Sequence, residues 1–262
     1  MSLKLSQRVQ AVKPSPTLAI TARAAELRAA GKDIIGLGAG EPDFDTPEHI
    51  RQAGIEAIKA GKTRYTAVDG TASLKQAIID KFKRDNNFSF EANQILVSCG
   101  GKQSFYNLAQ AILDPGDEVI IPAPYWVSYP DMAILAGGVP VYINADAEQN
   151  FKITPQQLEA AITEATRLFV INSPSNPTGM AYSMEELEAL GKVLESHPKI
   201  VIATDDMYEH ILWEGNTFCN SLNACPQLED RIIVLNGVSK AYAMTGWRIG
   251  YAGGPAELIK AM

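Results

Sequence analysis

A lysine and an arginine lie eight residues apart in a segment of small and apolar residues, Ser239–Tyr251. Lys240 offers an amine, which can form a Schiff base with an aldehyde. Arg248 offers a guanidinium, which can hold a phosphate through a planar fork of donors. Pyridoxal 5'-phosphate carries an aldehyde and a phosphate on one ring, so the pair indicates a site for this cofactor.

The alternative for two basic residues is an ordinary surface loop, because lysine and arginine are common on protein surfaces. The neighbouring Tyr242, Trp247 and Ile249 are large and mostly apolar, which predicts that Lys240 and Arg248 are buried. Buried charges need partners or a ligand. The flanking residues therefore favour the cofactor site.

Polar side chains also follow two apolar runs that read as buried strands. Asn176 lies in a tight turn after residues 168–171, and Asp205 and Tyr208 follow residues 200–203. In open α/β sheets, ligands bind at the carboxyl ends of the strands. We therefore expect an amide, a carboxylate and a phenol at one binding edge.

A metal site is the alternative for the carboxylates, since Asp206 lies beside Asp205. Consecutive strand residues point to opposite faces, which disfavours shared ligation. His49, His197 and His210 are scattered along the chain. The sequence predicts no metal site.

With these residues in view, the chain resembles the fold-type I, class I/II aminotransferases, and among them the bacterial aspartate aminotransferase subgroup that includes aspartate/prephenate aminotransferases. The resemblance covers essentially the whole chain. Its motifs are 39–44 (Ala-Gly-Glu-Pro-Asp-Phe), 100–103 (Gly-Gly-Lys-Gln), 124–126 (Pro-Tyr-Trp), 176–179 (Asn-Pro-Thr-Gly), 205–208 (Asp-Asp-Met-Tyr) and the lysine segment.

Alternation of apolar runs and helical patterns predicts an α/β fold, a three-layer α/β/α arrangement with a mainly parallel sheet. The glycine-rich loop 36–42 lacks an immediate helix and contains Pro42, which argues against a dinucleotide fingerprint. The expected strands are 33–37, 95–98, 118–121, 139–143, 168–171, 200–203, 232–235 and 248–252. The expected helices are 17–31, 47–60, 71–86, 101–113, 126–136, 155–162, 184–196 and one starting near 255.

The resemblance also implies the domain organisation. Residues 1–46 would form an N-terminal arm and part of a small domain, and residues 47–262 the large domain that binds pyridoxal phosphate. The family continues into a C-terminal small domain that holds the arginine for the substrate α-carboxylate. We therefore expect a chain truncated at its C-terminus, with that arginine outside these residues.

The resemblance implies roles at the cofactor ring. Lys240 would hold the cofactor as a Schiff base and then move a proton at the substrate. Asp205 would pair with the pyridine nitrogen, while Tyr208 and Asn176 would hydrogen-bond the phenolic oxygen. Trp126 would stack on the ring. A plain turn residue at Asn176 and core packing of Trp126 stay open as alternatives.

The phosphate would bind where a strand turns into a helix at Gly100, Gly101 and Lys102, because backbone N–H groups at a helix start favour an anion. Arg248 would add charge. Related enzymes often carry a serine three residues before the lysine, where this chain has glycine. Ser239 is the candidate donor in its place.

Three further residues concern the substrate and the partner subunit. Gly40 would let backbone approach the substrate, which Trp126 and Asn176 would also contact. Lys102 and Lys13 would hold a side-chain carboxylate, with ordinary surface lysines as the alternative. Tyr65 would reach the phosphate of a neighbouring subunit, which implies a homodimer with shared sites.

The composition of the chain argues against nucleic acid and membranes as binding partners. The net charge is −7 without a basic run, which excludes a typical nucleic-acid-binding protein, and no apolar stretch is long enough to span a membrane. Three cysteines, Cys99, Cys219 and Cys225, show no zinc-like pairing and fit a cytoplasmic protein.

The resemblance implies transamination between amino acids and 2-oxo acids, through two half-reactions and a pyridoxamine form. The expected reaction is L-aspartate + 2-oxoglutarate to oxaloacetate + L-glutamate. A prephenate or aromatic aminotransferase of the same fold is one alternative. A noncatalytic pyridoxal-phosphate module is another, but such a regulator would need a basic DNA-binding segment that the N-terminus lacks.

Overall fold

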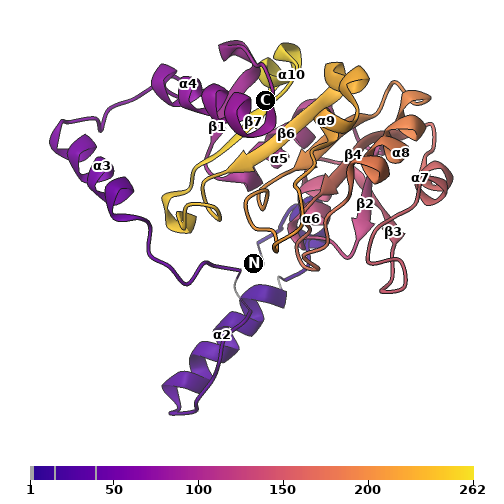
Figure 1. Cartoon of the computed structure of the whole chain (residues 1–262). Helices are drawn as coiled ribbons and strands as arrows, with labels where there is room; N and C mark the ends of the chain where they lie inside the picture. Colours follow the sequence, from indigo (N-terminus) through magenta and orange to yellow (C-terminus); the bar gives the residue numbers. More distant parts are fainter. Residues whose placement is uncertain (1–2, 15, 39) are drawn as a thin grey trace.

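A computed structural model describes residues 3–14, 16–38 and 40–262 (Figure 1). Its centre is one seven-stranded sheet with the order β1-β7-β6-β5-β4-β2-β3. The strands are β1 (Ile95–Ser98), β2 (Glu118–Ala123), β3 (Val139–Asn144), β4 (Thr166–Asn172), β5 (Val201–Asp205), β6 (Ile232–Gly237) and β7 (Gly250–Gly253).

Five neighbouring strands, β6-β5-β4-β2-β3, are parallel, and β7 is antiparallel to both β6 and β1. The prediction of a mainly parallel sheet is confirmed. The sequence predicts the β7 strand from Arg248, but the strand starts at Gly250. Arg248 has φ 54°, a left-handed conformation that cannot continue an extended strand.

Helices cover both faces of the sheet, so the three-layer prediction is also confirmed (Figure 1). On one face, α5 (Gly101–Ile112), α6 (Ser128–Leu135) and α10 (Ala256–Ala261) bury apolar residues such as Phe105, Tyr129 and Ile259. On the other face lie α4 (Ala72–Lys81), α7 (Pro155–Ala161), α8 (Met184–Glu195) and α9 (Ser221–Ala224).

Side-chain caps start several of these helices. Thr71 accepts a hydrogen bond from the backbone of Leu74 at the start of α4. Thr154 and Ser183 begin α7 and α8 with reciprocal capping boxes. The short helical turns are the π-helix η1 (Phe82–Asn86) and the 3-10 helices η2 (Ala92–Gln94), η3 (Pro226–Arg231) and η4 (Thr245–Trp247).

The N-terminal helices are α1 (Gln7–Ala11), α2 (Pro16–Ala29) and α3 (Glu48–Lys59). Figure 1 shows α2 and α3 set apart from the sheet. The predicted strand at residues 33–37 is wrong: this segment is irregular, and Ile35 and Leu37 are 85% and 91% exposed. No described strand lies beside it, and an unpaired apolar run cannot form a sheet alone.

In the part of the chain that the structure describes, no helix is long and apolar enough to cross a membrane. Cys99, Cys219 and Cys225 are all free thiols.

Candidate active site

The predicted site residues gather at one edge of the sheet because the strand register aligns them. Asn172 at the end of β4 pairs with Asp205 at the end of β5. Gly237 at the end of β6 pairs with Gly250 at the start of β7, which also pairs with Ser98 at the end of β1. The loops that leave these strand ends carry the amide, the carboxylate, the lysine and the helix start predicted from the sequence.

Lys240 lies half-buried in the loop after β6, and its Nζ donates a hydrogen bond to the backbone carbonyl of Gly40. Burial lowers the pKa of this amine, and the Arg248 guanidinium lowers it further, against the opposing charge of Glu41. A lowered pKa increases the fraction of unprotonated amine, which is the form that attacks an aldehyde.

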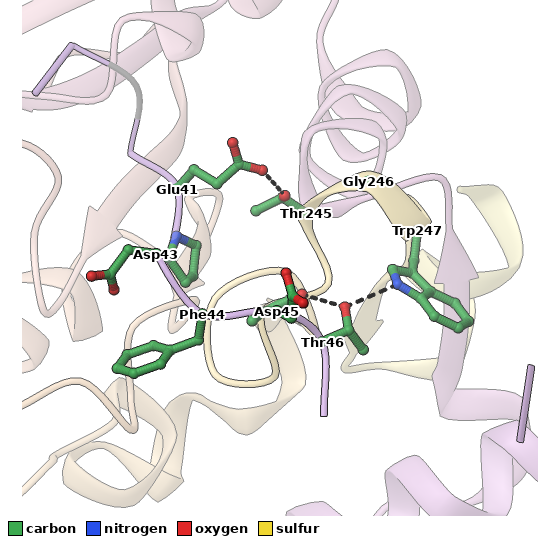
Figure 2. Close-up of a pocket in the computed structure, with 10 residues that line it drawn as sticks. Glu41, Asp43, Phe44, Asp45, Thr46, Thr245, Gly246 and Trp247 are labelled. Atoms are coloured by element: carbon green, nitrogen blue, oxygen red, sulfur yellow. Dashed lines mark hydrogen bonds between the residues drawn. The ribbon is translucent and has the colours of Figure 1, made fainter. Parts of the chain in front are cut away.

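Residues 41–46 form a strap along the lysine loop, with a cleft between them (Figure 2). The Thr245 hydroxyl donates to the Glu41 carboxylate. Thr46 Oγ1 donates to the carbonyl of Ala243 at 2.5 Å, and Trp247 Nε1 donates to Thr46 Oγ1 at 3.1 Å. These contacts hold the segment that follows Gly40 against the loop of the lysine.

Arg248 lies against the turn between β1 and α5. Gly100 adopts φ +89°, and a Cβ there would collide with the Arg248 guanidinium. A Cβ on Gly250 would collide with the Gly100–Gly101 peptide, so glycines allow this close approach. The guanidinium and the free N–H groups at the start of α5 therefore face one place where an anion can bind.

Arg248 is nevertheless exposed, so the expectation that both basic residues are buried is wrong for it. Its left-handed backbone turns the residue out of the apolar loop, and Nη1 donates to the carbonyl of Thr245 at 2.6 Å. Apolar neighbours in sequence do not bury a side chain when the loop between them lies at the surface.

Asp205 is partly buried at the end of β5. Its Oδ2 accepts a hydrogen bond from the phenol of Tyr129, and its Oδ1 accepts one from the backbone N–H of Met207 at 3.2 Å. Burial raises the pKa of the Asp205 carboxyl, and both hydrogen bonds oppose that rise. A cationic ligand atom at this carboxylate would favour its charged form.

Asp206 points away from Asp205 and has partners of its own. Thr204 Oγ1 donates to one of its oxygens at 2.8 Å, and the Asn220 amide donates to the other. Its side chain is buried, with an exposed fraction of 1%. No group of three His, Cys, Asp or Glu side chains that could hold a metal ion occurs among the described residues.

Tyr208 and Asn176 meet in front of β4 and β5, with Asn176 Nδ2 3.5 Å from the Tyr208 hydroxyl. Asn172 holds the turn that leads from β4 to Asn176, since its Oδ1 accepts a hydrogen bond from the Asn176 backbone N–H at 2.7 Å. Its Nδ2 donates to the Asp205 carbonyl at 2.9 Å. Burial and the Asp205 charge raise the pKa of Tyr208, while the Asn176 amide lowers it.

Trp126 and Lys102 also lie together. Lys102 Nζ is 5.1 Å from the centre of the Trp126 ring, within cation–π range. The Trp126 ring meets Tyr129 edge to face, with ring centres 5.2 Å apart. Trp126 is thus connected through Tyr129 to Asp205.

The remaining predicted residues are less closely tied to this edge. Ser239 is buried beside Lys240, and its carbonyl accepts from the Met244 backbone at 3.1 Å. Lys13 is exposed in the loop after α1, a helix that contacts α6. Tyr65 is fully exposed, and the structure brings it to no site residue of its own chain.

Sequence reasoning missed Tyr129 and Asn172, which hold Asp205 from two sides. Tyr129 lies in the first turn of α6, three residues after Trp126, and its backbone N–H donates to the Trp126 carbonyl at 3.1 Å. Asn172 is the last residue of β4, and its polarity after an apolar run was the available signal.

Comparison with known proteins gives the family. The family model described as "Aminotransferase class I and II" matches residues 32–262. The aspartate/prephenate aminotransferase of Nitrosomonas europaea is 70% identical over 260 residues, which are 99% of this chain and 66% of that protein. The corresponding enzyme of Cereibacter sphaeroides is 59% identical, over 98% of this chain and 64% of its own length.

Solved structures of aspartate aminotransferases are also similar to this chain. The aspartate aminotransferase from Rhizobium meliloti has a TM-score of 0.96 and 52% identity, covering 99% of this chain and 65% of that one. The aspartate aminotransferase from Thermus thermophilus with maleate has a TM-score of 0.94 and 48% identity, covering 99% and 67%. The chain spans less than two thirds of the length of the curated relatives named here, 66% and 64%. With a family model that matches most of it and relatives at this identity, the chain belongs to the aminotransferase class I and II family.

Proposed function

We propose that this protein is a pyridoxal-phosphate-dependent aminotransferase that converts L-aspartate and 2-oxoglutarate to oxaloacetate and L-glutamate. One observation carries the proposal. A half-buried amine of lowered pKa, Lys240, leaves the same sheet edge as the carboxylate of Asp205 and the glycine turn against Arg248. An aldehyde, a ring nitrogen and a phosphate on one ligand match these three groups.

The residues at the edge fit this cofactor. Lys240 would hold the aldehyde carbon, and Asp205 would keep a proton on the ring nitrogen. Tyr208 and Asn176 would hydrogen-bond the phenolic oxygen, and Trp126 would cover the ring. Gly100, Gly101, Lys102, Ser239 and Arg248 would surround the phosphate.

When bound, the cofactor supplies the electron sink that lets the substrate lose its α-proton. The chain's part is to position and to move that proton. The Lys240 amine, whose pKa is lowered by burial and by Arg248, would accept it as a general base. The strap that follows Gly40 would cover the substrate on the side of the lysine loop.

The substrate class rests on the cations beside the site and on the relatives. Lys102 lies over Trp126, and Lys13 follows a helix that contacts α6, so both can supply charge for a second carboxylate. The Thermus thermophilus aspartate aminotransferase was solved with maleate, a dicarboxylate. Prephenate is the second candidate substrate, because the curated relatives are named for both aspartate and prephenate.

A panel of amino and 2-oxo acids tests the reaction. Pyridoxal phosphate added to the purified protein should give a visible absorption band, and aspartate should remove it. Glutamate formation from aspartate and 2-oxoglutarate should exceed that from alanine. No band, or equal turnover of every donor, would contradict the proposal.

Replacing Lys102 with alanine should lower kcat/KM for aspartate and glutamate but spare alanine or an aromatic amino acid. A charge-assisted hydrogen bond contributes about 1.5–3 kcal/mol, or roughly tenfold to a hundredfold in kcat/KM. Affinity for pyridoxal phosphate should change little, because the backbone N–H of residue 102 remains. An equal fall for all substrates would assign Lys102 to the cofactor instead.

We also propose a homodimer with shared sites. Tyr65 is fully exposed, and many apolar side chains between residues 3 and 68 are exposed as well, by 45% or more, a surface that a second copy would cover. Mixing Tyr65→Phe chains with Lys240→Ala chains should give heterodimers in which one site carries both changes and the other neither. The mixture should therefore be more active than either parent. Activity no higher than that of the parents would argue against shared sites.

The cellular setting belongs to the same proposal. Three free thiols fit a reducing cytoplasm, and an acidic chain of net charge −7 fits small-molecule partners rather than nucleic acid or membranes. The domain boundary between residues 46 and 47 stays a prediction.

A further inference from the structure

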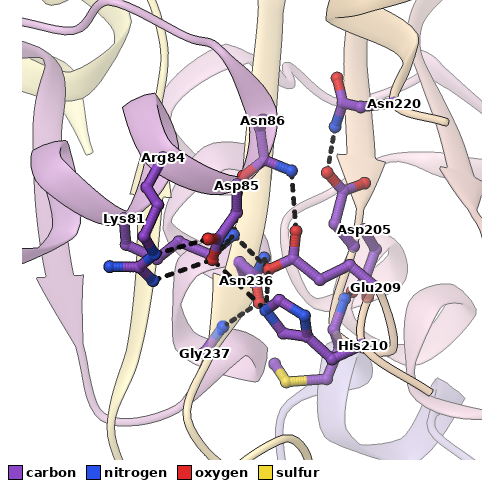
Figure 3. Close-up of polar contacts among 12 residues, drawn as sticks. Lys81, Arg84, Asp85, Asn86, Asp205, Glu209, His210, Asn220, Asn236 and Gly237 are labelled. Atoms are coloured by element: carbon purple, nitrogen blue, oxygen red, sulfur yellow. Dashed lines mark hydrogen bonds and ion pairs between the residues drawn. The ribbon is translucent and has the colours of Figure 1, made fainter. Parts of the chain in front are cut away.

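A buried ion pair lies next to the candidate site, on residues to which no role has been given above (Figure 3). Glu209 directly follows Tyr208 in the chain, and its carboxylate pairs with the amine of Lys81 at the end of α4. The two side chains are only 4% and 8% exposed. Charges with so little water around them depend on well-placed partners.

Two asparagines complete the pair. Asn86 Nδ2 donates to Glu209 Oε2 at 2.8 Å, and Asn236 Nδ2 donates to Glu209 Oε1 at 2.8 Å. Lys81 Nζ donates to Asn86 Oδ1 at 2.7 Å. Among the described residues, no buried side-chain nitrogen or oxygen lacks a partner. A fully satisfied buried network of this kind holds its members in one arrangement.

His210 and Asp85 form the outer side of the network. His210 Nε2 lies 3.4 Å from Glu209 Oε1 and 3.5 Å from Asp85 Oδ2, and Lys81 Nζ lies 3.9 Å from Asp85 Oδ2. His210 is exposed, whereas Glu209 is not. His210 therefore lies between Glu209 and solvent. The contact that links Glu209 to the candidate site is made by another residue of the network.

That connection runs through Asn236. Its Oδ1 accepts a hydrogen bond from the backbone N–H of Gly237 at 2.7 Å, and Gly237 is three residues before Lys240. Glu209 is anchored to its own segment, since its backbone N–H donates to the Asp206 carbonyl at 3.0 Å. One carboxylate thus joins the segment with Asp205 and Tyr208 to the segment that leads into the lysine loop.

The space around Gly237 makes this link sensitive to small movements. A Cβ on Gly237 would lie 3.0 Å from the Ile249 carbonyl and 3.0 Å from Met207 Cε. The backbone is therefore closely packed at Gly237, where the lysine loop leaves β6. Close packing of this kind would pass a shift of Asn236 along the backbone toward Lys240.

We propose that Glu209 is a positioning residue of the transamination site: held by Lys81, Asn86 and Asn236, it fixes the lysine loop relative to the segment that carries Asp205 and Tyr208. This inference rests on the proposed function. Glu209 acts through Asn236, because every side-chain partner of its carboxylate in the described part of the chain belongs to the network or to His210.

The test uses the reactivity of Lys240 in the full chain without cofactor. Reductive methylation by formaldehyde and cyanoborohydride is followed by peptide mass spectrometry, and Lys240 is normalised to Lys199 of the same digest. The variants are Glu209→Gln, Asn236→Ala and their double variant. Leu190→Ala, a buried position in α8, is the control for a general loss of stability.

Glu209→Gln and Asn236→Ala should each change the Lys240 rate by about threefold or more, the effect of a pKa change of about half a unit. The double variant should change it no further, because both break one link. Leu190→Ala should lower Tm and leave the rate unchanged. In the holoenzyme, the same two variants should lower kcat with a smaller change in KM.

Three results would overturn the proposal. A change in Glu209→Gln but not in Asn236→Ala would mean that the carboxylate acts by its charge. An equal change in Leu190→Ala would mean general loosening, and no change in any variant would mean a purely structural pair. If Glu209→Gln does not fold, Asn236→Ala and Glu209→Gln/Lys81→Met, which removes both charges, decide the question.

Failure of the proposed function would be seen separately. It would appear as no visible absorption when pyridoxal phosphate is added to the unaltered protein. The methylation rates are measured without cofactor, so they test the link from Glu209 to Lys240 whether or not the protein binds pyridoxal phosphate.

Discussion

Lys240→Ala should abolish transamination while leaving the fold intact. The variant loses the amine that would hold the cofactor and carry the α-proton. A positioned general acid–base alone contributes about 10²–10⁴-fold to a rate, so kcat should fall by at least that factor. Among the residues that the structure describes, the half-buried amine donates to the Gly40 carbonyl alone, so its removal leaves no buried charge there unpaired.

Glutamate formation from aspartate and 2-oxoglutarate measures the loss, and circular dichroism checks the fold. Lys199→Ala, at a side chain that is 69% exposed, is the matched control and should retain full activity. Partial recovery of Lys240→Ala by a small added amine would support the proton-transfer role. Activity within tenfold of the unaltered protein would show that another group does this work.

Asp205→Ala should have the second largest effect on rate, and Asp206→Ala a larger effect on stability than on rate. Asp205 would stabilise the charge on the ring nitrogen, and removal of one such electrostatic partner costs about 10²–10³-fold in kcat. Asp206 instead satisfies Thr204 and Asn220 inside the fold. Unsatisfied buried groups cost about 1–3 kcal/mol, which lowers Tm.

The two variants form a natural pair, because the residues are adjacent and chemically identical. Steady-state kcat and thermal unfolding should be measured for both. The expected pattern is a low kcat with a moderate fall in Tm for Asp205→Ala, which leaves the Tyr129 hydroxyl without its acceptor. Asp206→Ala leaves both Thr204 and Asn220 without theirs, so its Tm should fall further while its kcat stays near normal. The reverse order would mean that the cofactor meets the other side of β5.

Much of the fold was predictable because apolar runs bounded by glycine and capping residues mark buried strands and amphipathic helices. The runs at 168–171 and 200–203 became the centre of the sheet, β4 and β5. The run at 33–37, Asp-Ile-Ile-Gly-Leu, is only partly apolar, and no described strand lies beside it. Sequence pattern reports burial tendency, whereas a strand also needs a neighbour.

The candidate site could be proposed from the sequence where chemistry depends on residue type, as for Lys240 and Asp205, whose roles stay predictions. It was not predictable where it depends on packing. Tyr129 reads as an apolar core residue of α6, and its contact with Asp205 joins residues 76 positions apart. Glu209 and Lys81 lie far apart in the sequence, and the folded chain buries them together.

The most direct test of the central claim is to map the lysine that holds the cofactor. The protein is incubated with pyridoxal phosphate, reduced with borohydride and digested, and the labelled peptide is sequenced by mass spectrometry. We predict a pyridoxyl group on Lys240 and none on Lys102 or Lys13. A label on any other lysine, with Lys240 unmodified, would contradict the assignment of the active site.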